Sequence, residues 1–374
     1  MTISFIIECV DCSENYRIRY GMGNNFPQSA SFQCTECSKK IKIGFKSKGE
    51  DRIIEGCRFI ENGGFEKDVK VVNLHPEIPT DKDRLNDPSL FQTMGLFQQL
   101  NNSNADIFKF KELQYIWSQF YSEWIKIEPL LRIVAKKNKD ELKRLKNIDF
   151  DVFSDEFHQW LGIFIRGKKD NIFEKINTEF LSIDSSEIKN YLNNEDKLIK
   201  QIYALCNVYM RHSENFQSTI FHQKYGWELT SDMTANVHWE DIESVYGDLY
   251  EIVGDLLTIP TMINNIKQGR DFDQFNTPGF TLDKFLKTDK AGRGTNFQSN
   301  PNLKQLTEFY FPWLRNGTHH KNSTFNSDTH EIILGVGKGG GTEKKINLIE
   351  YVRACNELFE VGIILSSLIL HLKK

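Results

Sequence analysis

Two pairs of cysteines near the amino terminus constrain the fold of this chain more than any other feature. Two residues separate the thiols within each pair, and twenty-one residues lie between the pairs, which are formed by Cys9, Cys12, Cys34 and Cys37. A two-residue spacing lets one tight turn direct both sulfurs at a tetrahedral ion, and a hairpin between the pairs delivers the second turn. Four thiolates leave no open coordination position, so we expect a structural Zn²⁺ site.

Short β-prone runs flank these cysteines, and the sequence therefore predicts that residues 1–48 form a small β-structure. This segment resembles zinc ribbons, which bind nucleic acid, bind protein or brace a neighbouring domain. The alternative is a pair of redox-active Cys-x-x-Cys motifs, but the surrounding βαβ pattern of such motifs is missing. We expect the other three cysteines to be core residues: Cys57, Cys206 and Cys355.

A chain of 374 residues is too long for one compact core, so we expect two or three units. After the ribbon, a β-prone extension and a proline-rich linker occupy 49–100, a middle helical region 101–185, and a helical bundle 186–374. The sequence therefore predicts a mainly α fold with a small β zinc ribbon. The evidence is apolar side chains at three- and four-residue steps, as on the buried face of a helix: Leu113 to Trp124, Phe153 to Phe164, and Trp239, Ile242, Tyr246, Leu249, Val253 and Leu256.

The last apolar stretch, 358–372, is interrupted by Glu360 and is shorter than the roughly 20 residues that cross a bilayer. We expect a buried terminal helix within 348–372 and no membrane association. Its apolar face has two interpretations, a contact between two copies of the chain or an internal core face. These residues are Leu358, Phe359, Val361, Ile364, Leu365 and Leu368.

Charge gives little guidance about partners, because the net charge is −4 and the pI is about 6.2. Any nucleic acid must therefore contact a local basic patch. A group of carboxylates in 240–255, which includes Asp255, is typical of the solvated side of an amphipathic helix. The first residues lack the features of a secretory signal, and we expect a cytoplasmic protein.

A polar motif with candidate catalytic residues follows an apolar segment near the end of the chain. In the sequence RNGTHH, Arg315 is followed by Asn316, and His319 and His320 close the motif. This arrangement resembles the signature of the HEPN superfamily, in which arginine and histidine lie four to six residues apart and Asn, Asp or His commonly follows the arginine. HEPN proteins place the motif between the late helices of a bundle. The resemblance covers about the last 140 to 190 residues, and a polar, glycine-rich insertion at 321–345 departs from it.

The resemblance implies a metal-independent endoribonuclease of a toxin or antiviral defence (abortive infection) system. It also implies a homodimer that brings two copies of the motif together. The residue chemistry is compatible with this reaction, since histidine transfers protons near neutral pH and arginine matches two phosphate oxygens. Asn316 would orient either partner. The sequence leaves open whether His319 or His320 is catalytic.

Two other functions remain open at this stage. The first is a non-catalytic adaptor in which the ribbon and the bundle bind nucleic acid or a protein partner. The second is a bundle that works with a nucleotidyltransferase encoded elsewhere. A nuclease of this kind would also need a trigger. The resemblance implies that the trigger is a regulatory protein, a phage-derived protein or a nucleic acid.

Overall fold

The computed structural model contains more β-structure than the sequence predicts. Among the residues that it describes, 50% are helical and 25% lie in strands, and these strands form three small sheets. The expected mainly α class is therefore wrong. The described residues are 2–22, 26–47, 51–60, 69–74, 168–194, 197–216, 219, 239–319, 323–326, 329–337 and 341–373. The two apolar stripes expected at 113–124 and 153–164 lie outside them.

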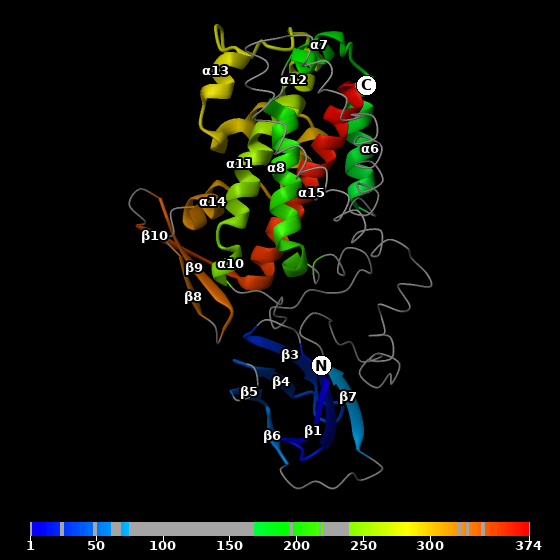
Figure 1. Cartoon of the computed structure of the whole chain (residues 1–374), viewed down its shortest axis with the longest axis vertical. Coiled ribbons are helices and arrows are strands. Elements are labelled where there is room, and N and C mark those ends of the chain that lie inside the picture. Colours follow the sequence, from blue (N-terminus) through cyan, green and yellow to red (C-terminus); the bar gives the residue numbers. More distant parts are fainter. Residues whose placement is uncertain are drawn as a thin grey trace, which may run out of the picture. The chain divides into compact units, whose positions relative to one another are not determined.

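The amino-terminal part forms two small sheets, coloured blue to cyan in Figure 1. The first has the order β6-β1-β2-β7 and the second the order β3-β4-β5. Strand β7 runs parallel to β2, and all other neighbours in the two sheets are antiparallel. The strands are β1 (Thr2–Cys9), β2 (Asn15–Gly21), β3 (Gln28–Gln33), β4 (Lys40–Phe45), β5 (Arg52–Glu55), β6 (Cys57–Phe59) and β7 (Lys70–Leu74).

Alternation along the strands explains why this small structure has its own core. In β2, Tyr16, Ile18 and Tyr20 are fully buried, and the arginines between them are more exposed. Residues of β6 and β7 complete the same hydrophobic cluster, so residues beyond position 48 contribute to the ribbon core. The ribbon therefore has a core of its own in addition to its cysteines.

The chain divides into two compact units. The first contains the ribbon and the described parts of 212–248 and 312–357, and the second contains those of 100–211, 249–311 and 358–374. Their helices are α6 (Lys168–Leu181), α7 (Ser186–Asn194), α8 (Lys197–His212), η1 (Ser213–Phe216), α10 (Trp239–Ile242), α11 (Val245–Leu256), α12 (Thr258–Lys267), α13 (Leu282–Lys287), η2 (Lys290–Phe297) and η3 (Leu303–Thr307).

The stripe predicted from Trp239 to Leu256 is buried at every position, as expected, but a turn divides it into α10 and α11. Tyr351 explains how this turn is held. Its hydroxyl lies 2.8 Å from the carbonyl of Ile242 and 3.0 Å from that of Glu243, and the Tyr246 N–H donates to it at 3.3 Å. One buried phenol thus replaces part of the helical hydrogen bonding at the break.

The candidate motif lies in a helix, apart from His320, which is outside the described residues. The apolar segment before it forms the short helix η3, and a new helix, α14 (Pro312–His319), then begins at a proline. The insertion at 321–345 contributes most of a three-stranded antiparallel sheet of order β10-β9-β8. These strands are β8 (Ser323–Asn326), β9 (Glu331–Val336) and β10 (Thr342–Asn347).

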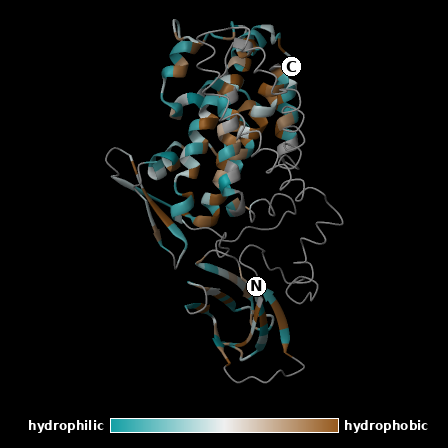
Figure 2. Cartoon of the chain, in the orientation of Figure 1, coloured by the Kyte–Doolittle hydropathy of each residue, from teal (hydrophilic) through white to brown (hydrophobic). Residues whose placement is uncertain are grey.

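The last helix, α15 (Leu348–Lys373), confirms the predicted terminal helix. It is long and apolar enough to cross a membrane by length and composition, but 94% of its most apolar part is buried inside the protein. The six apolar residues considered for a dimer contact are buried within the single chain, as an internal core face requires. Figure 2 shows hydrophobic and hydrophilic residues alternating around the other helices.

Candidate functional sites

Each cysteine pair lies on a turn with the same backbone hydrogen bonds. In the first turn the Cys9 N–H donates to the Glu14 carbonyl at 2.9 Å, and the Ser13 N–H donates back to Cys9 at 3.0 Å. The second turn repeats both bonds around Cys34, at 2.8 Å and 2.9 Å. Ser13 and Ser38 occupy equivalent positions, and both have a φ of 60°. We call these turns the two knuckles, residues 9–14 and 34–39.

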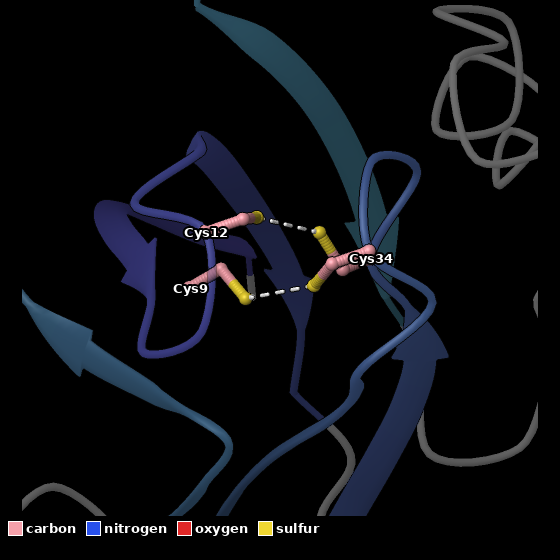
Figure 3. Close-up of side chains that lie close together, drawn as sticks. Cys9, Cys12 and Cys34 are labelled. Carbon is pink, nitrogen blue, oxygen red and sulfur yellow. Dashed lines mark hydrogen bonds between the residues drawn. The ribbon is translucent and has the colours of Figure 1, made fainter.

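The knuckles bring the four sulfurs together, as Figure 3 shows. All four Sγ atoms lie within 4.8 Å of one another, with 3.6 Å between Cys9 and Cys37 and 3.5 Å between Cys12 and Cys34. A tetrahedral ion with metal–sulfur bonds of about 2.3 Å places its sulfurs about 3.8 Å apart. A disulfide requires about 2.05 Å, and all four cysteines are free. The cluster is therefore positioned to bind a metal ion.

The environment of Cys34 favours the thiolate that a metal requires. The Tyr16 hydroxyl lies 3.1 Å from its Sγ. Burial raises the pKa of Cys34, but the hydrogen bond with Tyr16 and two backbone N–H donors outweigh burial and lower it to about 6. Cys9 and Cys34 are buried, whereas Cys12 and Cys37 are exposed. One side of the cluster therefore faces the ribbon core and the other faces solvent.

Lysines near the knuckles are paired with carboxylates of the ribbon itself. Lys39 lies 3.3 Å from Asp11, and Lys70 contacts both Glu14, at 3.1 Å, and Glu36. These pairs link the first knuckle to the second and to β7. Exposed pairs of this kind contribute little stability, but they reduce the positive charge that this surface offers to a phosphate backbone.

In the second candidate site, Arg315 and Asn316 lie in the middle of α14 and His319 lies at its end. The Arg315 Nη1 donates to the Asn316 Oδ1 at 3.0 Å. Arg315 and His319 are four positions apart and therefore share one face of the helix. Arg315 is half-buried, and Asn316 and His319 are exposed. His320 lies outside the described residues.

The opposite face of α14 is held tightly against the sheet, which Figure 1 shows beside this helix. A Cβ on Gly317 would lie only 2.8 Å from the Cβ of Leu334 in β9, so only glycine permits this approach. Thr318 is buried, and its hydroxyl donates to the Leu314 carbonyl at 3.0 Å. The buried face therefore fixes which way Arg315 and His319 point.

Two neighbours complete the surroundings of the motif. A Cβ on Gly247 of α11 would lie 3.6 Å from Nδ1 of His319, so the imidazole packs against the helix backbone there. On the side of α14 that faces the sheet, the Lys344 ammonium of β10 lies 4.7 Å from the centre of the Trp313 ring. Sequence spacing did not indicate Gly247 as part of this site, because α11 brings it there from a distant position.

Asp255 is a further residue whose role the sequence did not reveal. It is 3% exposed, and its Oδ1 accepts from the Arg293 guanidinium at 2.6 Å. Lys290 lies 3.1 Å from its other oxygen, and Gln201 donates to that oxygen at 2.7 Å. The expectation that it belongs to a solvated carboxylate face is wrong. The group is a buried ion cluster that joins α11, η2 and α8.

No protein family, curated protein or solved structure matched this chain in comparisons with known proteins. The candidate sites therefore depend on their own residues and geometry.

Proposed function

We propose that this protein is an endoribonuclease of the HEPN type, which uses Arg315 and a histidine of the RNGTHH motif and needs no metal ion for the chemistry. The observation that carries the proposal is the arrangement on α14, where Asn316 is hydrogen-bonded to Arg315 and His319 shares its helix face. A guanidinium and an exposed imidazole on one helix face suit a phosphodiester substrate.

The proposed reaction begins with attack by the ribose 2′-oxygen on the adjacent phosphorus. A histidine accepts the 2′-hydroxyl proton as the new O–P bond forms, and the bond from phosphorus to the 5′-oxygen breaks. A second imidazole donates a proton to the leaving oxygen, so the products are a 2′,3′-cyclic phosphate and a 5′-hydroxyl. Arg315 stabilises the negative charge on the pentacovalent phosphate, and Asn316 holds the guanidinium in position.

The reaction needs one imidazole to accept a proton and a second to donate one, and among the described residues a single motif has only His319. We therefore propose a homodimer with two motifs at one composite site. The apolar face of α15 is buried within the chain and does not provide this contact. The exposed end of α14 around His319 is the surface that must meet its symmetry mate. We further propose a cytoplasmic toxin or antiviral role, with a protein or nucleic acid as trigger.

For the knuckles we propose Zn²⁺ as the bound ion. Four thiolates from Cys9, Cys12, Cys34 and Cys37 match its preference for sulfur and for tetrahedral geometry. When bound, the ion supplies a structural cross-link between the two turns and has no position open for a substrate. This site therefore stabilises the ribbon and takes no part in RNA cleavage.

The direct test is to incubate the purified protein with RNA in EDTA and to analyse the ends of the products. The zinc content is measured afterwards by mass spectrometry, because loss of structural zinc would unfold the ribbon. We expect cleavage with cyclic phosphate ends. Intact RNA with folded, zinc-loaded and dimeric protein would contradict the proposal, and RNA binding without cleavage would favour the adaptor function instead.

Substitutions then assign the roles. Arg315→Ala should reduce cleavage by at least about 10²-fold and leave the free energy of unfolding within about 0.5 kcal/mol. His319→Ala and His320→Ala, measured separately, should show which imidazole transfers the proton, with a loss of about 10² to 10⁴ for the catalytic one. His371→Ala, which removes an exposed histidine of α15, is the matched control and should leave cleavage unchanged.

A further inference from the structure

A polar cavity in the second compact unit has no role in the sites described above. It has a volume of about 390 Å³ and lies between the end of α12, the loop of residues 268–281 and η2. Five carboxamide side chains line it: Asn264, Asn265, Gln268, Asn276 and Asn296. Arg270 is the only charged residue among the described residues that line it. A volume of this size is within the usual range for small-molecule sites.

The cavity wall contains an amide oxygen with an unsatisfied hydrogen-bonding capacity. Asn264 is 2% exposed, and its Nδ2 donates to the Asn296 carbonyl at 2.9 Å. Its Oδ1 has no donor among the described residues. Leaving a buried polar atom unpaired costs about 1–3 kcal/mol, which a ligand with its own N–H donor would offset.

The loop that forms one wall is held in place without a ligand. The Arg270 guanidinium donates to the Gln274 carbonyl at 3.3 Å, to Asn276 at 2.9 Å and to Asn265 at 3.3 Å. Asn265 in turn donates to the Phe272 carbonyl at 3.0 Å. The cavity is therefore preformed, which lowers the entropic cost of binding.

Arg270 is also available to an anion. Three of its five N–H donors are used in the bonds above, and among the described residues it makes no ion pair with a carboxylate. On the same wall, Phe275 and Phe280 pack edge to face, with 5.0 Å between ring centres. Both rings are half-buried and belong to the cavity lining. The cavity thus combines amides, aromatic rings and one uncompensated cation.

We propose that this cavity binds a nucleotide, with the base against the amides and the phenyl rings and the phosphate at Arg270. Carboxamides pair with the donor and acceptor groups on base edges, and aromatic side chains stack on base faces. Arginine binds phosphate oxygens in pairs. The nucleotide is either free or part of an RNA strand. This proposal holds whether or not the protein cleaves RNA, because it depends on none of the residues of α14.

Isothermal titration calorimetry on the full chain tests the proposal with adenosine monophosphate and ribose 5-phosphate as probes. We expect saturable binding of adenosine monophosphate with a Kd below about 1 mM. Ribose 5-phosphate should bind at least tenfold more weakly, because it lacks the base. Equal affinities, or no binding of adenosine monophosphate, would overturn the proposal.

A third probe, an oligoadenylate of five residues with 2′-O-methyl riboses, cannot be cleaved by attack of a 2′-hydroxyl. Binding at least tenfold tighter than that of adenosine monophosphate, lost when Ser299→Trp fills the cavity, would assign the cavity to a base of RNA. If the oligoadenylate binds no tighter than adenosine monophosphate, the cavity is assigned to a free nucleotide. Because this probe resists cleavage, the result does not depend on nuclease activity.

Variants at Ser299, which is exposed and lines the cavity, locate the binding without disturbing the core. Ser299→Trp should fill the cavity and weaken binding of adenosine monophosphate at least tenfold, whereas Ser299→Ala should change it less than twofold. Arg270→Ala should also weaken binding at least tenfold, and Lys287→Ala, which removes an exposed cation of α13 outside the cavity, should leave it unchanged. Unchanged binding in both Ser299→Trp and Arg270→Ala would overturn the proposal.

Discussion

The two knuckles and the α14 site differ in how much of their geometry is encoded locally. Each knuckle is a six-residue turn with the same two backbone hydrogen bonds. The spacing of its cysteines therefore determines most of the geometry of the site. The α14 site depends on Gly317 against Leu334, on His319 against Gly247 and on Lys344 against Trp313, all of which are contacts between distant segments. The two motifs are of similar length. The cysteine motif predicts most of the geometry of its site, whereas the RNGTHH motif predicts only part of the geometry of the α14 site.

The largest expected effect concerns the knuckles. Cys12→Ser removes one of four thiolates, and we expect loss of the bound zinc and unfolding of the ribbon, because the affinity of structural zinc is folding free energy, about 10–16 kcal/mol in small zinc domains. Native mass spectrometry would report the zinc, and hydrogen exchange of β1 to β4 would report the unfolding.

Cys57→Ala is the matched control for that substitution. Cys57 is a buried thiol of the same sheet, 7% exposed, and it lies outside the four-sulfur cluster. We expect this variant to retain one zinc per chain. Retention of zinc and of normal exchange protection in Cys12→Ser would show that the spacing of the cysteines has been misinterpreted.

The next effect concerns Asp255, whose role is set by tertiary contacts alone. Asp255→Ala leaves Arg293 buried without its counter-ion, and such a loss costs about 3–5 kcal/mol. Urea unfolding would measure it. Asp271→Ala, which removes an exposed carboxylate, is the control and should cost less than about 0.5 kcal/mol. Similar costs for the two variants would contradict the buried ion cluster.

The same carboxylate has a pH signature. Burial raises the pKa of Asp255, but Lys290, Arg293 and Lys197 outweigh burial and lower the pKa below its usual value. A lowered pKa contributes stability that is present above the unfolded-state value near 3.9 and is lost as pH falls through the folded value. The loss on acidification below about pH 4 should therefore be smaller in Asp255→Asn than in the wild type.

A smaller effect on stability would show how strongly α14 depends on its packing against β9. Gly317→Ala improves the intrinsic helix propensity by about 1 kcal/mol, but its Cβ would lie 2.8 Å from that of Leu334. We expect a net destabilisation of about 1–3 kcal/mol, because overpacking outweighs propensity. Asn316→Ala, at the exposed neighbouring position, should leave stability nearly unchanged. Thermal unfolding of the two variants compares them, and a stabilised Gly317→Ala would contradict the close approach to β9.

The same contrast explains what the sequence predicted. Apolar periodicity located the buried stripe from Trp239 to Leu256 and the terminal helix, since burial of one face is a local property of the pattern. It missed the break that Tyr351 holds, because that residue is more than a hundred positions away. It also missed β8 and β10, since β10 is largely polar and gains its partners only by pairing with β9. The fold class was wrong because strands make up 25% of the described residues, most of them in β1 to β7.

The smallest effect tests how completely a knuckle is encoded by its own residues. Ser38 is exposed and has a φ of 60°, which costs a residue with a side chain about 1–2 kcal/mol. Ser38→Gly removes this strain but adds flexibility to the unfolded chain, so we expect a gain of a few tenths of a kcal/mol up to about 1. Ser38→Val should lose stability, because a β-branched residue fits this backbone poorly. Competition with a chromogenic chelator measures both as changes in zinc affinity, tighter for glycine and weaker for valine. Equal affinities would mean that the ion and the surrounding sheets, rather than the turn itself, determine the knuckle conformation.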